Sequence, residues 1–117
     1  ICVYSLNALT NYALRGPSYV KKLIDARAIN VCHEVYSSAQ VNTKNLISIF
    51  VASLFACGAS SDLDPYFDNL VIEILTSGLD SEDEYVNELC SGVLKQYAAR
   101  YPDSYGYLYS MYSLYSF

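Results

Sequence analysis

The stretch ALTNYALRGPSYVKKLIDARAINVCHEVYSS, residues 8–38, decides the fold of this chain. Its pattern predicts the end of one helix, a Gly-Pro break, a short amphipathic helix, a tight corner near Arg27 and a third helix. Gly16 stops the first helix, and Pro17 suits the first position of the next one, where its missing N–H costs nothing. Similar units return later in the chain, so the repeat is the main clue to function.

Further helices are predicted over residues 2–14, 44–57 and 66–77. Another follows a capping-box pattern at residues 81–84 and runs to about Arg100, and a last one starts at Tyr101-Pro102. Because residues 44–57 are apolar nearly all round, this helix must be buried on most sides, and Asn42 or Thr43 is expected to cap it. Asp64-Pro65 is expected to open the following helix, which Gly78 ends. No stretch alternates with period two for long enough to predict a strand, so the fold class is all-α.

The internal repeat has a period of about 43 residues. Tyr12, Phe55 and Tyr97 fall in register at spacings of 43 and 42 residues, and an alanine follows each of them. A proline comes next in each copy, at positions 17, 65 and 102, and opens the next helix. Helical repeats of this length are typical of HEAT and armadillo solenoids.

The detail of the copies resembles the armadillo family. Residues 16–38 resemble the first two helices of an armadillo repeat, residues 8–14 the end of a third helix, and residues 83–99 a whole third helix. Arg27 stands where the family usually has glycine. The middle copy departs further, because its first helix, around residues 61–68, is shortened and its third helix is one residue longer.

The resemblance implies a right-handed armadillo-like solenoid of about seven helices. It forms a single domain over residues 1–117 with partial repeats at both ends, as in a fragment of a longer solenoid. A generic helical bundle is the alternative. Both ends, residues 1–4 and 105–117, lack the polar character of terminal caps, so we expect them to contact further repeats or a partner.

Armadillo third helices line a groove that often holds an extended peptide through an asparagine and a tryptophan one turn earlier. The matching asparagine positions here are Asn11, Leu54 and Gln96, and the matching tryptophan positions are Asn7, Phe50 and Gly92. Only Asn11 fits, and the chain has no tryptophan, so an extended peptide and a helix or protein face remain alternatives. The groove candidates are therefore Asn7, Asn11, Phe50, Leu54 and Gln96. The tyrosine-rich end either packs on the preceding repeat as a cap or contacts a missing repeat or a partner, in which case Tyr105, Tyr109 and Tyr112 are the interface candidates.

Charge and cysteine content narrow the function classes. The net charge is −5, with five basic and two acidic residues in 1–50 but two basic and nine acidic residues in 51–100, which argues against nucleic acid as a partner. Four scattered cysteines predict buried, reduced thiols. The longest apolar run, residues 46–57, is too short to span a membrane.

No pattern in the sequence predicts catalysis, a metal or a cofactor. The single histidine, His33, adjoins Cys32, but neighbouring helical residues point to different faces and so form no dyad. We therefore expect a non-catalytic protein-interaction scaffold that binds a partner protein, in the cytoplasm or, alternatively, in the nucleus, cytoskeleton or cilium. The alternative is a structural subunit buried in a large assembly, such as a cytoskeletal or ciliary complex.

Overall fold

The computed structural model describes residues 3–106 and 108 and is all-helical over them, which confirms the fold class. The described residues form eight α-helices and one short 3-10 helix. Their bounds are α1 (Val3–Ala13), α2 (Pro17–Asp25), α3 (Ala28–Tyr36), α4 (Val41–Cys57), α5 (Ser60–Leu63), η1 (Asp64–Tyr66), α6 (Asn69–Leu79), α7 (Glu84–Arg100) and α8 (Pro102–Tyr105). Within this part of the chain, no helix has the length and hydropathy needed to cross a membrane.

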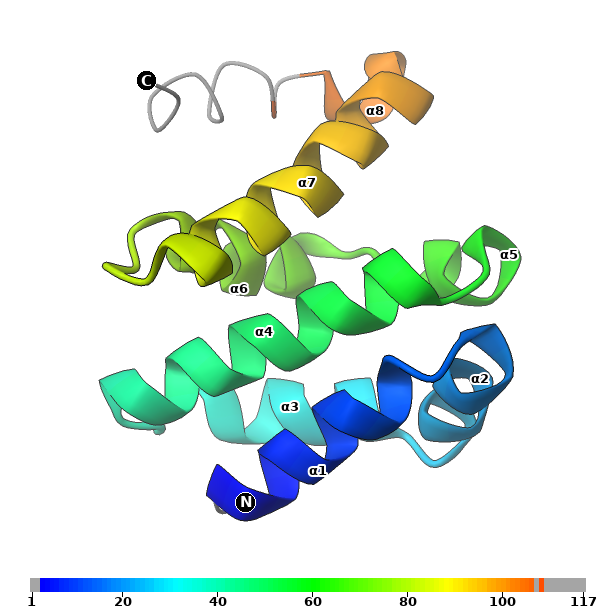
Figure 1. The fold of residues 1–117 in the computed structure, drawn as a ribbon. Coiled ribbons are helices and arrows are strands. Elements are labelled where there is room, and N and C mark those ends of the chain that lie inside the picture. Colours follow the sequence, from blue (N-terminus) through cyan, green and yellow to red (C-terminus); the bar gives the residue numbers. More distant parts are fainter. Residues whose placement is uncertain (1–2, 107, 109–117) are drawn as a thin grey trace.

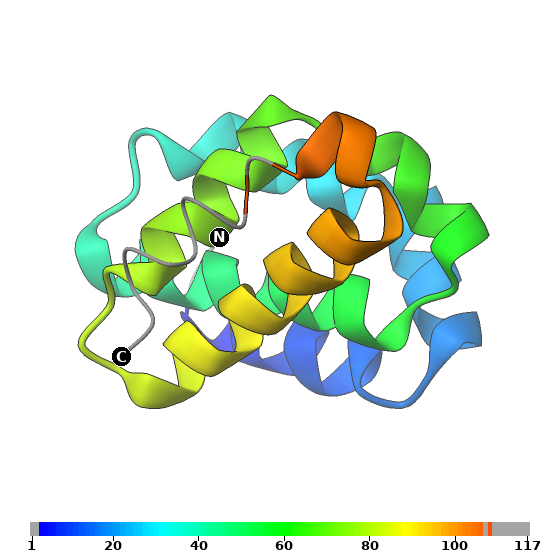
Figure 2. The ribbon, with the colours of Figure 1, turned by 90° about the horizontal axis from the view of Figure 1, so that it is seen from above.

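The three helices that carry the repeated Tyr12, Phe55 and Tyr97 positions lie side by side in one row. Figure 1 shows α1, α4 and α7 following one another up the molecule, with α4 in the middle and in contact with both neighbours. Helices α3 and α6 lie behind this row, and α6 packs against both α4 and α7. The view from above separates α7 from α6 in the same way (Figure 2).

The start of the first full unit follows the sequence pattern closely. Gly16 precedes α2 with φ 131°, a conformation that side chains rarely allow, and Pro17 occupies the first turn. Arg27 forms the predicted corner and adopts the left-handed conformation, with φ 64° and ψ 34°. Arg27 therefore takes up backbone angles that glycine adopts with less strain.

Helix α4 begins earlier than was predicted from the polar residues Asn42 and Thr43. It starts at Val41, so Asn42 and Thr43 lie inside its first turn, and the N-cap residue Gln40 makes no side-chain capping bond. The prediction that Asn42 or Thr43 caps this helix is wrong. Polar residues are tolerated in a first turn because its N–H groups still face solvent.

The middle copy differs most from the expected pattern. Asp64 and Pro65 belong to the short η1 and do not open a long helix; α6 begins only at Asn69, because the Asp68 carboxylate accepts a hydrogen bond from the Val71 N–H at 2.9 Å. Gly78 lies within α6, one residue before its end. A Cβ at Gly78 would lie 2.4 Å from the Cys90 sulfur, so this glycine allows α6 and α7 to approach closely.

The core is built around α4. Phe50, Val51 and Leu54 are completely buried, and Phe55 is only 4% exposed. Among the described cysteines, Cys32 and Cys90 are buried and Cys57 is half-buried, and all three are free thiols. Burial raises the pKa of Cys32 to about 11 and that of Cys90 to about 12, so both thiols stay protonated at neutral pH.

Candidate functional site

The row formed by α1, α4 and α7 carries the residues predicted to line a groove. Asn7 and Asn11 on α1 and Gln96 on α7 are exposed. Phe50 and Leu54 on α4 are 0% exposed, so the prediction that they line a groove is wrong. Because α4 contacts α1 on one side and α7 on the other, its central turns belong to the core.

The solvent-accessible residues of α4 lie in its first half and near its last turn. Val41 and Asn42 are exposed in the first turn, Asn45 and Ile49 are half-buried, and Ala56 is exposed near the last turn. The family positions carried over to α4 are buried because this helix packs against α1, α6 and α7. The sequence offered a warning against assigning Phe50 and Leu54 to a groove, because a helix that is apolar nearly all round must be buried on most sides.

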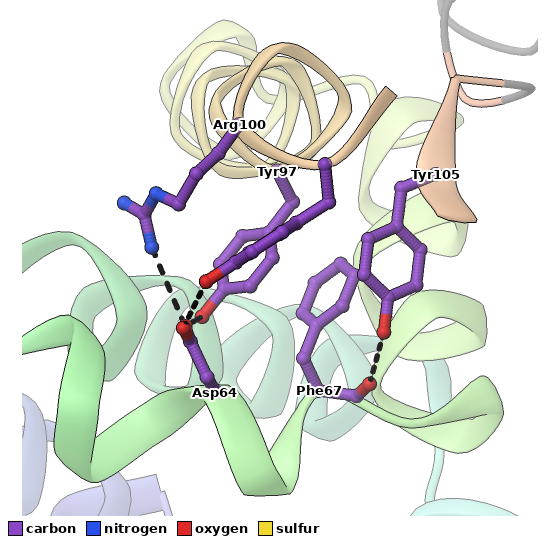
Figure 3. A network of polar contacts seen from close by, with 6 residues as sticks. Asp64, Phe67, Tyr97, Arg100 and Tyr105 are labelled. Carbon is purple, nitrogen blue, oxygen red and sulfur yellow. Dashed lines mark hydrogen bonds and ion pairs between the residues drawn. The ribbon is translucent and has the colours of Figure 1, made fainter. Parts of the chain in front are cut away.

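A second feature is a polar cluster on Asp64, shown in Figure 3. The Tyr97 hydroxyl donates a hydrogen bond to Asp64 Oδ1 at 2.7 Å, and the Tyr101 hydroxyl donates to Oδ2. Arg100 Nη1 lies 3.3 Å from Oδ1. These contacts join η1 to the end of α7, at the point where the chain turns into α8.

The groups of this cluster shift one another's pKa values in defined directions. Burial raises the pKa of Asp64, but hydrogen bonds from Tyr101 and Tyr97 and the positive charge of Arg100 outweigh it, so the pKa is lowered overall. Burial and the bond to Asp64 raise the pKa of Tyr97. At neutral pH the cluster therefore holds a carboxylate, two neutral phenols and a guanidinium ion.

Aromatic rings continue the cluster into the core. Phe67 stacks on Tyr97 with ring centroids 3.8 Å apart, Phe55 meets both rings edge-on, and Tyr105 meets Phe67 edge-on at 4.9 Å. The Tyr105 hydroxyl donates a hydrogen bond to the Phe67 carbonyl oxygen at 3.3 Å (Figure 3). Tyr105, predicted as an interface residue, thus packs within the chain. Tyr109 and Tyr112 lie outside the described residues.

A third feature, which we name the corner groove, lies between two helix connections. Its cavity of about 670 Å³ is lined on one wall by side chains from residues 36–45 and on the other by side chains from residues 77–83. Both connections lie at the left end of the ribbon in Figure 1. A smaller cavity of about 520 Å³ adjoins Asp64, Tyr97 and Tyr101.

His33 has a defined environment that the sequence did not predict. Its side chain is 21% exposed, and Nε2 lies 3.8 Å from Asp68 Oδ1, the atom that caps α6. Nε2 itself is buried and makes no hydrogen bond. Asp68 follows His33 by 35 positions, so the helical pattern around His33 gave no sign of this contact. Within residues 3–106 and 108, no three His, Cys, Asp or Glu side chains converge as metal ligands.

Comparison of the chain with family models, with curated proteins and with solved structures found no match.

Proposed function

We propose that this chain is a short armadillo-like solenoid that works as a non-catalytic protein-interaction scaffold. The partner protein binds across the row of α1, α4 and α7. Exposed Asn7, Asn11 and Gln96 supply polar contacts at the two sides of that row. No reaction is assigned to the chain, because His33 faces the capping carboxylate of α6 rather than a nucleophile.

One observation carries this proposal. Helices α1, α4 and α7 are one repeat length apart in the sequence and lie side by side, with α3 and α6 behind them (Figure 1). Stacking of equivalent helices is how repeat proteins build an extended binding face from local contacts. Fold alone does not determine function, so the partner must be sought by experiment.

Site-specific photo-crosslinking tests the proposed binding face. A photoreactive amino acid at Asn11 or Gln96 is expected to capture the same partner from a cell extract, in competition with the unlabelled chain. Matched positions outside the row, Lys21 on α2 and Glu73 on α6, are exposed and are expected to capture much less of it. Equal capture at all four positions, or capture at none, would contradict the proposal.

A second candidate function is that of a structural subunit within a large assembly. It is favoured by two exposed apolar side chains, Leu14 just after α1, 50% exposed, and Val31 on α3, 39% exposed. Sedimentation over a dilution series distinguishes the two functions, because a free binding module stays monomeric whereas an assembly subunit self-associates or needs its neighbours.

A further inference from the structure

The corner groove has a rigid wall built from the α6–α7 connection. The Asn87 side-chain amide shares its two N–H donors among three carbonyl oxygens, those of Gly78 at 2.8 Å, Leu79 at 3.1 Å and Ser81 at 2.8 Å. Asp83 caps α7 by accepting a bond from the Tyr85 N–H at 2.9 Å. This wall is therefore held in one conformation before anything binds to it, which lowers the entropy lost on binding.

The same wall carries three carboxylates that form no ion pair with any residue the structure describes. Asp80, Glu82 and Asp83 line the cavity and are exposed. Within the described residues, the ion pairs involve other carboxylates, those of Asp25, Asp64 and Asp68. The single lysine in the groove, Lys44, has its ammonium 5.2 Å from the centre of the Tyr36 ring.

The opposite wall offers apolar surface and free amide groups. Val41 is 74% exposed, the highest value among the large hydrophobic residues of the described chain. Asn42 and Asn45 also line the groove, and neither side chain has a hydrogen-bond partner within residues 3–106 and 108. An asparagine amide has both donors and an acceptor, which suits it to the backbone of an extended peptide.

We propose that the corner groove binds an extended segment of a partner protein that carries lysine or arginine beside an apolar side chain. The basic groups would meet Asp80, Glu82 and Asp83, and the apolar side chain would cover Val41. Charge complementarity selects this occupant, because an acidic or purely apolar segment would leave the three carboxylates without counter-charges. This inference rests on the proposed interaction function and assigns it a site at the helix corners, away from the exposed positions of α1 and α7.

Fluorescence anisotropy tests the inference with a labelled twelve-residue peptide in which four lysines and two leucines alternate with glycine and serine. The chain is expected to bind it with a Kd in the micromolar range at low salt, and binding should weaken as salt rises. A peptide with glutamate in place of lysine, and one with serine in place of leucine, should both bind less tightly.

Two triple variants each remove three negative charges, one set inside the corner groove and one set outside it. Asp80→Asn, Glu82→Gln and Asp83→Asn together should weaken binding about tenfold, and asparagine at 83 preserves the cap of α7. Glu34→Gln, Glu73→Gln and Asp103→Asn together remove three exposed carboxylates outside the groove and should leave the Kd within about twofold. Circular dichroism with thermal melting confirms that both variants fold.

Several outcomes would overturn the inference. These are failure of the native chain to bind the lysine peptide, equal weakening by both triple variants, and binding of calcium in a titration with no binding of the peptide. If the peptide fails while crosslinking at Asn11 and Gln96 still captures a partner, this inference is wrong and the proposed function stands. If crosslinking fails as well, both are wrong.

Discussion

At the scale of single residues, Arg27 shows how this sequence departs from the pattern it resembles. The corner between α2 and α3 needs a left-handed residue, and the chain supplies arginine where the resemblance leads one to expect glycine. The break in helical spacing therefore revealed the corner in the sequence, although glycine, the residue that best suits the left-handed conformation, is missing there. The cost of that conformation for a residue with a side chain is about 1–2 kcal/mol.

Arg27→Gly is expected to stabilise the protein slightly, by about 0.5 kcal/mol, because relief of this strain exceeds the added entropy of the unfolded chain. Ala26→Gly is the matched control, since Ala26 has φ −83° and ψ 8° and gains nothing from glycine. The control should be destabilised by up to about 1 kcal/mol. Urea unfolding measures both, and a fall in stability for Arg27→Gly would contradict the strain argument.

Phe55 tests the core assignment at a single position. Phe55→Asp is expected to abolish folding, because a buried unpaired charge costs several kcal/mol of the roughly 5–15 kcal/mol that hold a domain together. Ala56→Asp is the neighbouring control, and its side chain is exposed on the same helix. Circular dichroism should show loss of helix for the first variant only. A folded Phe55→Asp protein would contradict the assignment of Phe55 to the core.

Asp64 is expected to make stability depend on pH in the acid range. Its pKa is lower in the folded chain than the ordinary value of 3.8, so its contribution is present above that value and is lost as pH falls through the folded pKa. Asp64→Asn should remove part of this acid dependence and lower stability at neutral pH. Asp103→Asn, at an exposed carboxylate, is the control. Parallel curves of stability against pH for Asp64→Asn and the native chain would contradict the prediction.

At the scale of elements, the sequence predicted helices best where apolar spacing and capping residues agree. The helix expected to follow the capping-box pattern at residues 81–84 and to run to about Arg100 is α7, which begins at Glu84 with Asp83 as its cap and ends at Arg100, before Pro102. The helix expected from residue 66 begins at Asn69 instead. The Asp64 carboxylate looked like a cap there, but it bonds to Tyr97 and Tyr101, which follow it by more than 30 positions. Local patterns cannot reveal such distant partners.

Two glycines test how closely α6 and α7 pack. Gly78→Ala is expected to destabilise the protein by about 1–3 kcal/mol, because the added Cβ would meet the Cys90 sulfur at 2.4 Å. Gly92→Ala meets nothing within 4 Å and replaces glycine in the interior of α7. It should stabilise by up to about 1 kcal/mol. Thermal melting compares them, and a Gly78→Ala protein as stable as the native chain would show that α6 and α7 can separate without cost.

At the scale of the whole molecule, the sequence predicted the all-α class and the exposed candidates Asn7, Asn11 and Gln96, but not the corner groove. The groove joins residues 36–45 to residues 77–83, and only the packing of successive units brings these two segments together. The acidic residues at 80–84 are visible in the sequence, but no local pattern shows that they face a second wall. Their opposite wall, with Val41 and Asn45, had no signal in the sequence that linked it to them.

The central place of α4 has a consequence for how the molecule melts. Because α4 contacts α1 on one side and α6 and α7 on the other, neither half keeps its core when the other unfolds. We therefore expect one cooperative calorimetric transition, with equal van't Hoff and calorimetric enthalpies. Amide protons of α4 should exchange only through global unfolding, whereas those of the short α5 and α8 should exchange through local opening. Two separate transitions would mean that the halves are independent folding units.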